Sequence, residues 1–136
     1  MNRIIRILTI VVLCLVLLFV CCSVKFGGID RALRYLGGER ILVNPGRIVS
    51  AAAGPCNRQV ELVNLSFERL TVITANTHCT CTTISDLPVS LGPGEQCLVD
   101  VRYNLDSLDP GGSTTLELIT TSPAAPSVLL EFVRAE

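Results

Sequence analysis

The sequence has no tryptophan and only one histidine, His78. Without tryptophan, no indole is available to pack on a central disulfide, which excludes an antibody-type domain. With a single histidine there is no plausible Ser-His-Asp set, and neither a Gly-x-Ser-x-Gly element nor a phosphate-binding loop is present. These absences predict that the protein is not an enzyme.

Basic residues are too few for a nucleic-acid-binding face. All 12 acidic residues lie after Val24, whereas only eight of the 11 basic residues lie beyond Phe26. The chain beyond the first 25 residues is therefore net acidic, and nucleic-acid recognition needs a basic surface. We predict no nucleic-acid partner.

Charged residues are absent from Ile7 to Val24. As an α-helix this run would be about 27 Å long, close to the roughly 30 Å hydrocarbon core of a bilayer. A cleaved signal peptide needs a shorter apolar core and small residues before the cut, and no Ala-x-Ala pattern is present. We expect an uncleaved anchor over residues 1–25, with cleavage, or lipidation at Cys21 or Cys22, as the alternative.

The orientation of this anchor is not decided by charge, because basic residues flank the apolar run on both sides. The cysteines favour an outside location. Four follow the anchor, an even number that is compatible with two disulfides in an oxidising compartment; they are Cys56, Cys79, Cys81 and Cys97. We predict a single-pass protein of the cell membrane whose C-terminal part lies on the extracytoplasmic, periplasmic side.

Residues 26–40 have the pattern of a linker with one short amphipathic helix. Ile29, Leu33 and Leu36 fall at positions i, i+4 and i+7, between two Gly-Gly pairs. We expect this helix to lie on the membrane surface or against the next domain. A partner-binding helix is the alternative.

Residues 41–136 are predicted to form the main domain, because the pattern from Arg40 on consists of short β-forming runs separated by turn residues. The run Leu87–Leu91 contains Pro88 and suits an edge strand. The runs are 40–44, 47–53, 59–64, 70–76, 79–85, 87–91, 96–103, 113–121 and 127–133. Seven to eight such strands, with almost no helical periodicity, predict an all-β, immunoglobulin-like β-sandwich preceded by an N-terminal transmembrane helix.

The segment around Cys79 and Cys81 is the main candidate for chemistry. In an extended chain both thiols point to one face and His78 to the other. Cu(I) or zinc could bind the thiols, with Cys97 or Cys56 as a third sulfur and with His78 only if the chain bends. The favoured alternative is a structural role, either as a disulfide from one of the pair to Cys56 or Cys97 or as a buried thiol, and a strained, redox-active Cys79–Cys81 bond is the third. No other cofactor is expected.

Several motifs follow one another in a characteristic order. They are Val63-Asn64, Leu70-Thr71-Val72-Ile73, Cys79-Thr80-Cys81-Thr82, Pro93-Gly94-Glu95 and Val99-Asp100-Val101-Arg102-Tyr103. With them, the region from about Gly46 to Arg134 resembles a bacterial family of exported domains of unknown function with a Cys-Gly-Cys-Thr signature. That family belongs to the immunoglobulin-like sandwiches of the Hydin-like and major-sperm-protein group. Here Thr80 replaces the glycine, which removes its backbone freedom. The resemblance implies a fold and an exported setting, but no activity.

These features together predict a non-enzymatic, membrane-anchored binding or scaffolding module on the extracytoplasmic side. Its expected partner is another envelope protein, contacted through a sheet edge or the loops around Cys79. The alternative function is a thiol site that binds copper or zinc, or exchanges disulfides, through the Cys-x-Cys pair.

Overall fold

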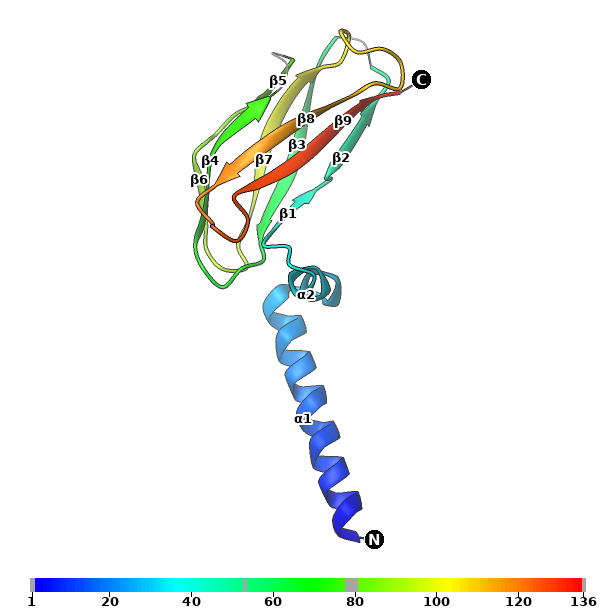
Figure 1. Cartoon of the computed structure of the whole chain (residues 1–136), viewed down its shortest axis with the longest axis vertical. Helices are drawn as coiled ribbons and strands as arrows, with labels where there is room; N and C mark the ends of the chain where they lie inside the picture. Colours follow the sequence, from blue (N-terminus) through cyan, green and yellow to red (C-terminus); the bar gives the residue numbers. More distant parts are fainter. Residues whose placement is uncertain (1, 53, 78–80, 136) are drawn as a thin grey trace. The chain divides into compact units, whose positions relative to one another are not determined.

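The computed structural model describes residues 2–52, 54–77 and 81–135 (Figure 1). The chain divides into two compact units, Met1–Gly38 and Glu39–Glu136.

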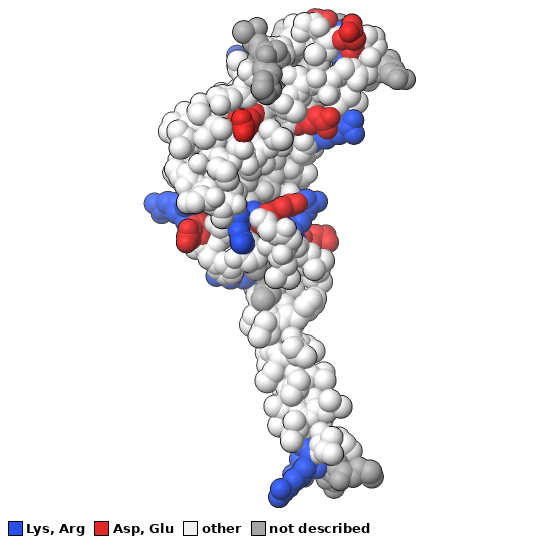
Figure 2. All heavy atoms as spheres, viewed as in Figure 1, with Lys and Arg blue, Asp and Glu red and all other residues white. Residues whose placement is uncertain are grey.

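The first unit begins with helix α1, Asn2–Phe26. Its segment Arg3–Lys25 has a mean hydropathy of 3.2, and none of its apolar window is buried. Figure 2 shows basic side chains at the N-terminal end of α1 and an uncharged stretch beyond them. Helix α1 is therefore long and apolar enough to cross a membrane, a property that secretory signal sequences share.

Helix α2, Ile29–Leu36, follows after Gly27 and Gly28. Both glycines have positive φ angles, 71° and 154°, which residues with a side chain rarely adopt. The Gly28 N–H donates to the Ser23 carbonyl at 3.0 Å, and the backbone then turns into α2. The helix predicted in this linker is confirmed.

The second unit is a β-sandwich of two sheets (Figure 1). In the first sheet the strand order is β1-β3-β7-β5, with β1 Ile41–Asn44, β3 Pro55–Asn64, β7 Gln96–Asn104 and β5 Thr82–Ile84. In the second sheet the order is β2-β9-β8-β4-β6, with β2 Arg47–Ser50, β9 Ser127–Arg134, β8 Ser113–Thr120, β4 Leu70–Thr77 and β6 Val89–Leu91. Neighbouring strands are antiparallel except β2 and β9, which are parallel.

The core lies between the sheets and is made by alternate residues of the strands. It includes Val60, Leu62, Val99, Val101, Leu116, Leu118, Leu130 and Phe132, all of them almost fully buried. The rings of Tyr103 and Phe132 face each other across the sheets with centroids 5.2 Å apart. Each large apolar side chain buried in this way contributes about 1.5–3 kcal/mol, so the alternation seen in the sequence is what holds the sheets together.

The predicted fold class is confirmed: the second unit is an immunoglobulin-like β-sandwich, preceded by an apolar N-terminal helix. Each of the nine β-forming runs of the sequence overlaps one strand, so the described residues form nine strands where seven to eight were predicted. The strand predicted for 59–64 begins earlier, at Pro55, and the one predicted for 79–85 is described only from Thr82 to Ile84.

Short strands lie at the two edges of the sandwich, where one stretch of chain pairs first with one sheet and then with the other. Strand β1 pairs with β3 and, after Pro45, β2 pairs with β9. Strand β5 pairs with β7 and, after Pro88, β6 pairs with β4. Proline has no backbone N–H to extend a ladder, which suits it to both crossings. We call these the β1–β2 edge and the β5–β6 edge.

Each edge strand is short, so its neighbour is paired on that side over only part of its length. Strand β1 pairs with Glu61–Asn64 of β3, which leaves Pro55–Val60 without an edge strand among the described residues. Strand β6 pairs with Leu70–Val72 of β4, which leaves Ile73–Asn76 without an edge strand among the described residues.

Asn64 joins the ends of β3 and β6. Its side chain has no exposed surface. The Nδ2 group donates to the carbonyls of Glu68, Leu91 and Gly92 at 2.7, 3.0 and 3.1 Å. The Oδ1 atom accepts from the N–H and the hydroxyl of Ser66 at 2.9 and 2.7 Å. This buried amide is fully hydrogen-bonded and fixes the turn that follows the Val63-Asn64 motif.

Candidate functional site at the β5–β6 edge

A cavity of about 270 Å³ opens beside β5, between the two sheets. Its lining comes from strands β4, β5 and β8 and from the crossing to β6, and consists of Thr74, Ala75, Thr77, Thr82, Thr83, Ile84, Leu87 and Leu116. None of these side chains carries a charge. The site is therefore a neutral depression with apolar residues inside and threonines around it.

The cavity exists because small side chains occupy inner positions of β4. Ala75 pairs with Leu118 and Thr77 with Leu116, and both leucines are fully buried in the core. Residues directly opposite each other share a face of the sheet, so Ala75 and Thr77 also face inward. A methyl group and a hydroxyl-bearing side chain fill less space than the leucines opposite them, and the layer between the sheets is left open here.

The backbone beside this cavity is the part of β4 beyond the β6 ladder. The described ladder to β6 ends at Val72, and the ladder to β8 continues through Thr74–Thr77 with a bulge between Val72 and Thr74. One side of β4 is thus paired and the other is bordered by the cavity. A strand with one open side is a template for pairing with another chain.

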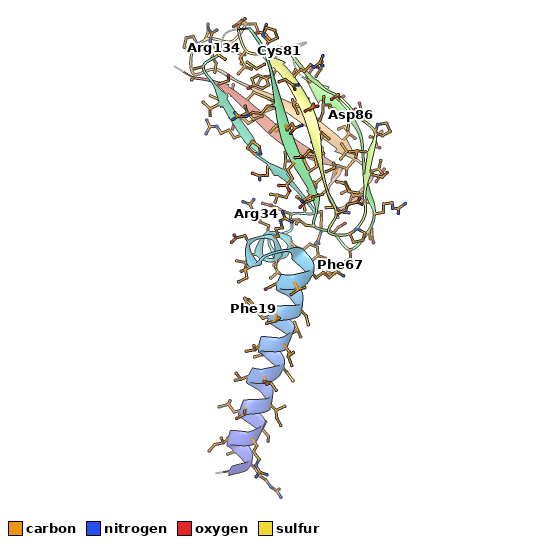
Figure 3. The ribbon with its side chains drawn as sticks, turned by 180° about the vertical axis from the view of Figure 1, so that it is seen from behind. Phe19, Arg34, Phe67, Cys81, Asp86 and Arg134 are labelled. Atoms are coloured by element: carbon orange, nitrogen blue, oxygen red, sulfur yellow. The ribbon has the colours of Figure 1, made fainter. Side chains whose placement is uncertain are left out.

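A second, more open depression of about 410 Å³ lies on the other side of β5. It is lined by Pro55, Cys81, Thr83, Arg102, Tyr103, Asn104, Asp106 and Ser107. The Asn104 N–H donates to the Cys81 carbonyl at 2.7 Å, which holds Cys81 against the end of β7. Figure 3 shows Cys81 at the same end of the sandwich as Arg134.

The pairing of the four candidate cysteines stays a prediction. Cys56 and Cys97 are free thiols in this structure, in keeping with the buried-thiol alternative rather than with a disulfide to either of them. Cys81 is disulfide-bonded, and neither of these two is its partner. Cys79, the other residue of the motif, lies outside the described residues, and its pairing stays a prediction.

The sheet register explains why the expected disulfides do not form. Cys56 lies opposite Tyr103, and Cys97 lies opposite Leu62, which places the two thiols about six residues, or roughly 20 Å, apart along the sheet. Thr82, next to Cys81, and Cys56 lie on opposite sides of Tyr103, so two strand spacings, about 9.5 Å, separate their strands. The Cα atoms of a disulfide lie within about 7 Å of each other, so β5 is too far from Cys56 for a bond.

Cys97 is half-buried against the core near the start of β7. Burial raises the pKa of its thiol, and the nearby Glu95 carboxylate raises it further. A raised pKa disfavours the thiolate, which is the reactive and metal-binding form. Cys97 is therefore poorly suited to the role of third sulfur ligand.

The predicted metal site stays a prediction, because His78 and Cys79 lie outside the described residues. Within the described ranges, no group of three or more His, Cys, Asp or Glu residues could hold a metal ion. Cys81, the described member of the proposed ligand set, contacts the hydroxyl of Thr82 at 3.7 Å.

The sequence predicted β4 but not the cavity beside it. The available signal was Ala75, a small residue at an inward position of a strand otherwise rich in Val, Ile and Thr. Its meaning depends on how far β6 extends along β4, and a sequence pattern does not show that.

No protein-family model and no curated protein sequence matches the chain. Solved structures do match. WR4, a member of the MSP family from C. elegans, gives a TM-score of 0.55 at 13% identity, over 71% of this chain and 99% of that chain. A protein of unknown function from Porphyromonas gingivalis W83 gives a TM-score of 0.59 at 12% identity, over 71% of this chain and 46% of that chain.

The protease VesB from Vibrio cholerae gives a TM-score of 0.55 at 14% identity. The likeness covers 74% of this chain and 33% of VesB, so this chain spans only a part of the longer proteins it matches. Identities this low show the fold alone. They support an immunoglobulin-like sandwich of the kind found in MSP-domain proteins, and the presence of a protease among them leaves the question of activity to the site itself.

Proposed function

We propose that this protein is a membrane-anchored, extracytoplasmic binding module without catalytic activity, which holds an extended segment of an envelope protein along the open side of β4. The observation that carries the proposal is the position of the neutral cavity beside Ile73–Asn76, the part of β4 beyond the β6 ladder. In strand addition, main-chain hydrogen bonds supply affinity and a pocket for alternate side chains supplies specificity. Both parts are present on β4.

The chemistry of the bound segment follows from β6, which already pairs with the other part of β4. Val89 lies opposite Val72 and Leu91 opposite Leu70, and both pack against the core, whereas Ser90 between them is exposed. A segment that continues the line of β6 would place alternate side chains in the cavity. We therefore expect an uncharged strand with alternating apolar and small polar residues.

The anchored, extracytoplasmic setting is part of the same proposal. Helix α1 supports it by its length and hydropathy, and the disulfide at Cys81 supports an oxidising compartment. The order of motifs that resembles an exported family points the same way. The absence of a catalytic function is proposed because the cavity at the β5–β6 edge is lined only by Thr, Ala, Ile and Leu side chains.

The proposal is tested by site-specific photo-crosslinking in the producing cells. A photoreactive residue is placed at Thr74, on the open part of β4, or at Gln59, on the open part of β3, as a matched control. Both positions are exposed. We expect crosslinking to one envelope protein from Thr74 only, and mass spectrometry should locate the crosslink in an uncharged, extended segment.

A synthetic peptide with that sequence is then titrated against full-length protein in lipid nanodiscs. The Ala75→Leu variant fills the cavity and should weaken binding at least about tenfold, which is about 1.4 kcal/mol. Thermal unfolding confirms that the variant is folded. Equal crosslinking from Gln59, or unchanged peptide affinity in folded Ala75→Leu protein, would refute the proposed binding site.

A further inference from the structure

Helix α2 carries an apolar face that is exposed. Ile29, Leu33 and Leu36 are 47%, 60% and 79% exposed, and no residue of α2 is buried. At about 100° per residue, the three side chains fall within an arc of about 60° on the helix surface. Three large apolar side chains on one narrow stripe are unfavourable in water, so this face needs a cover.

The opposite face of α2 is basic. Arg31 and Arg34 lie about 140–160° away from Ile29 around the helix axis. Over the stretch from Lys25 to the end of α2, three basic residues stand against Asp30 alone. A short helix with a narrow apolar stripe and a basic polar face is the composition of helices that lie in the membrane interface.

The position of α2 in the chain brings it to that interface. It starts at Ile29, four residues after Lys25, the last residue of the apolar segment, and only Phe26 and the two turn glycines lie between them. In Figure 1 α1 runs lengthwise while the much shorter α2 is seen close to end-on, so the two helix axes are far from parallel. A helix that turns sideways at the end of a membrane-spanning helix lies in the headgroup layer.

We propose that α2 is an interfacial helix that lies in the headgroup layer of the membrane that α1 spans. Ile29, Leu33 and Leu36 point toward the acyl chains, and the basic face favours a leaflet containing anionic lipid. This proposal rests on the anchor part of the proposed function and is independent of the binding site on β4. It makes α2 a second, lateral contact of the first unit with the bilayer.

Fluorescence quenching tests this placement, because the chain has no native tryptophan. Three single-tryptophan variants of the full-length protein are used: Leu33→Trp in α2, Phe19→Trp in α1 and Leu98→Trp on β7. All three side chains are exposed in the structure. Each variant is extracted from membranes and placed in nanodiscs of phosphatidylcholine and phosphatidylglycerol, whose lipids carry bromine either near the headgroup or near the chain end.

We expect the Leu33→Trp variant to lose emission with the shallow bromines and to have a blue-shifted spectrum. The Phe19→Trp variant should be quenched most by the deep bromines, and the Leu98→Trp variant by neither. Unquenched, water-like emission of the Leu33→Trp variant would overturn the inference, and so would unquenched blue-shifted emission, which indicates that protein covers the residue. In either case, quenching of the Phe19→Trp variant would leave the anchor proposal intact. If the membrane-extracted protein lacks residues 1–25 by mass, both are overturned.

Discussion

The two edges of the sandwich have the same construction and opposite chemistry. At the β1–β2 edge, the open part of β3 starts with Pro55 and carries Arg58. Arg58 lies opposite Val101, a core residue, so it occupies an inward-facing position on an open strand. At the β5–β6 edge, the open part of β4 has no proline and no charge, and it borders a cavity.

This difference indicates which edge is available to a partner. Proline and inward-pointing charges are the features by which natural sheets prevent edge-to-edge pairing. Adding a strand beside Arg58 would require the guanidinium to be buried without a partner, which is costly. No such cost applies beside Ala75. The comparison therefore predicts one protected edge and one receptive edge in the same domain.

The largest effect is expected from Asn64, because it holds the end of β3 and the end of β6 at once. Asn64→Ala leaves the buried carbonyls of Leu91 and Gly92 without their amide donor, and should lower the free energy of unfolding by about 3 kcal/mol. For a domain of this size that is a fall of about 10–20 °C in Tm. Ser66→Ala, the control, removes a hydroxyl at the exposed end of the network and should cost about 1 kcal/mol. A loss below 1 kcal/mol in Asn64→Ala would show that the edges are held independently.

The protected edge can be opened by replacing Arg58. In Arg58→Val the inward charge is gone and β propensity rises, so stability should change by less than about 1 kcal/mol. The variant should nevertheless self-associate in detergent solution, as measured by size-exclusion chromatography with light scattering. Arg58→Lys keeps the charge and serves as the control. If Arg58→Val and Arg58→Lys behave alike, charge is not what protects this edge.

The sandwich also contains two free thiols, Cys56 on the open part of β3 and Cys97 near the start of the inner strand β7. The folded-state pKa of Cys97 is raised above its ordinary value of 9.0, so the fold favours the protonated thiol. Its contribution to stability is complete below pH 9.0 and is lost as pH rises through the folded-state pKa. Urea unfolding should show that the free energy of unfolding falls less between pH 8 and pH 10 in Cys97→Ala than in wild type. Glu95→Gln removes the carboxylate that raises the pKa of Cys97, so it should speed alkylation of that thiol.

The same thiols allow the disulfide to be assigned. Alkylation of the unfolded, non-reduced protein should label Cys56 and Cys97 but not Cys81. If Cys79 is the partner of Cys81, as one of the sequence alternatives has it, Cys79→Ser should expose Cys81 as an additional thiol in peptide mapping. A bond from Cys81 to either of these two thiols would contradict the structure.

The smallest effect is expected at the ion pair between β2 and β9. The Arg47 Nε and Glu131 Oε2 atoms are 3.3 Å apart, and both side chains are largely exposed. Arg47→Ala should change the free energy of unfolding by less than about 1 kcal/mol, with a difference that shrinks in high salt. A larger effect in chemical denaturation would mean that attachment of the β1–β2 edge depends on this pair.

The sandwich was predictable because its strands alternate with a period of two. In β7, Val99, Val101 and Tyr103 are buried on one face while Leu98 and Arg102 are exposed on the other. The sheet that each short strand joins was not predictable in the same way. A short run next to a proline gives no indication of which sheet it pairs with, and at both edges the chain pairs with each sheet in turn.

The candidate site was predictable only in outline. The sequence pointed to a sheet edge and to the region of Cys79, and β5 with its two depressions follows that region directly. The disulfides expected to Cys56 or Cys97 could not be checked from the sequence, because a sequence gives no distances between strands. Cys56 and Cys97 both face the core, as their alternation indicates, but the register places them far apart.

Three features could be read from the sequence: an apolar N-terminal run that forms one long helix, an amphipathic stripe on a short second helix, and a domain of alternating β strands. These are local or periodic properties, and burial of the apolar face follows from the pattern alone. Only the tertiary structure decided how far β6 extends along β4, which thiols are free, and that Ala75 borders a cavity. Those depend on the relative registers of strands distant in the chain, because a shift of register changes which groups meet.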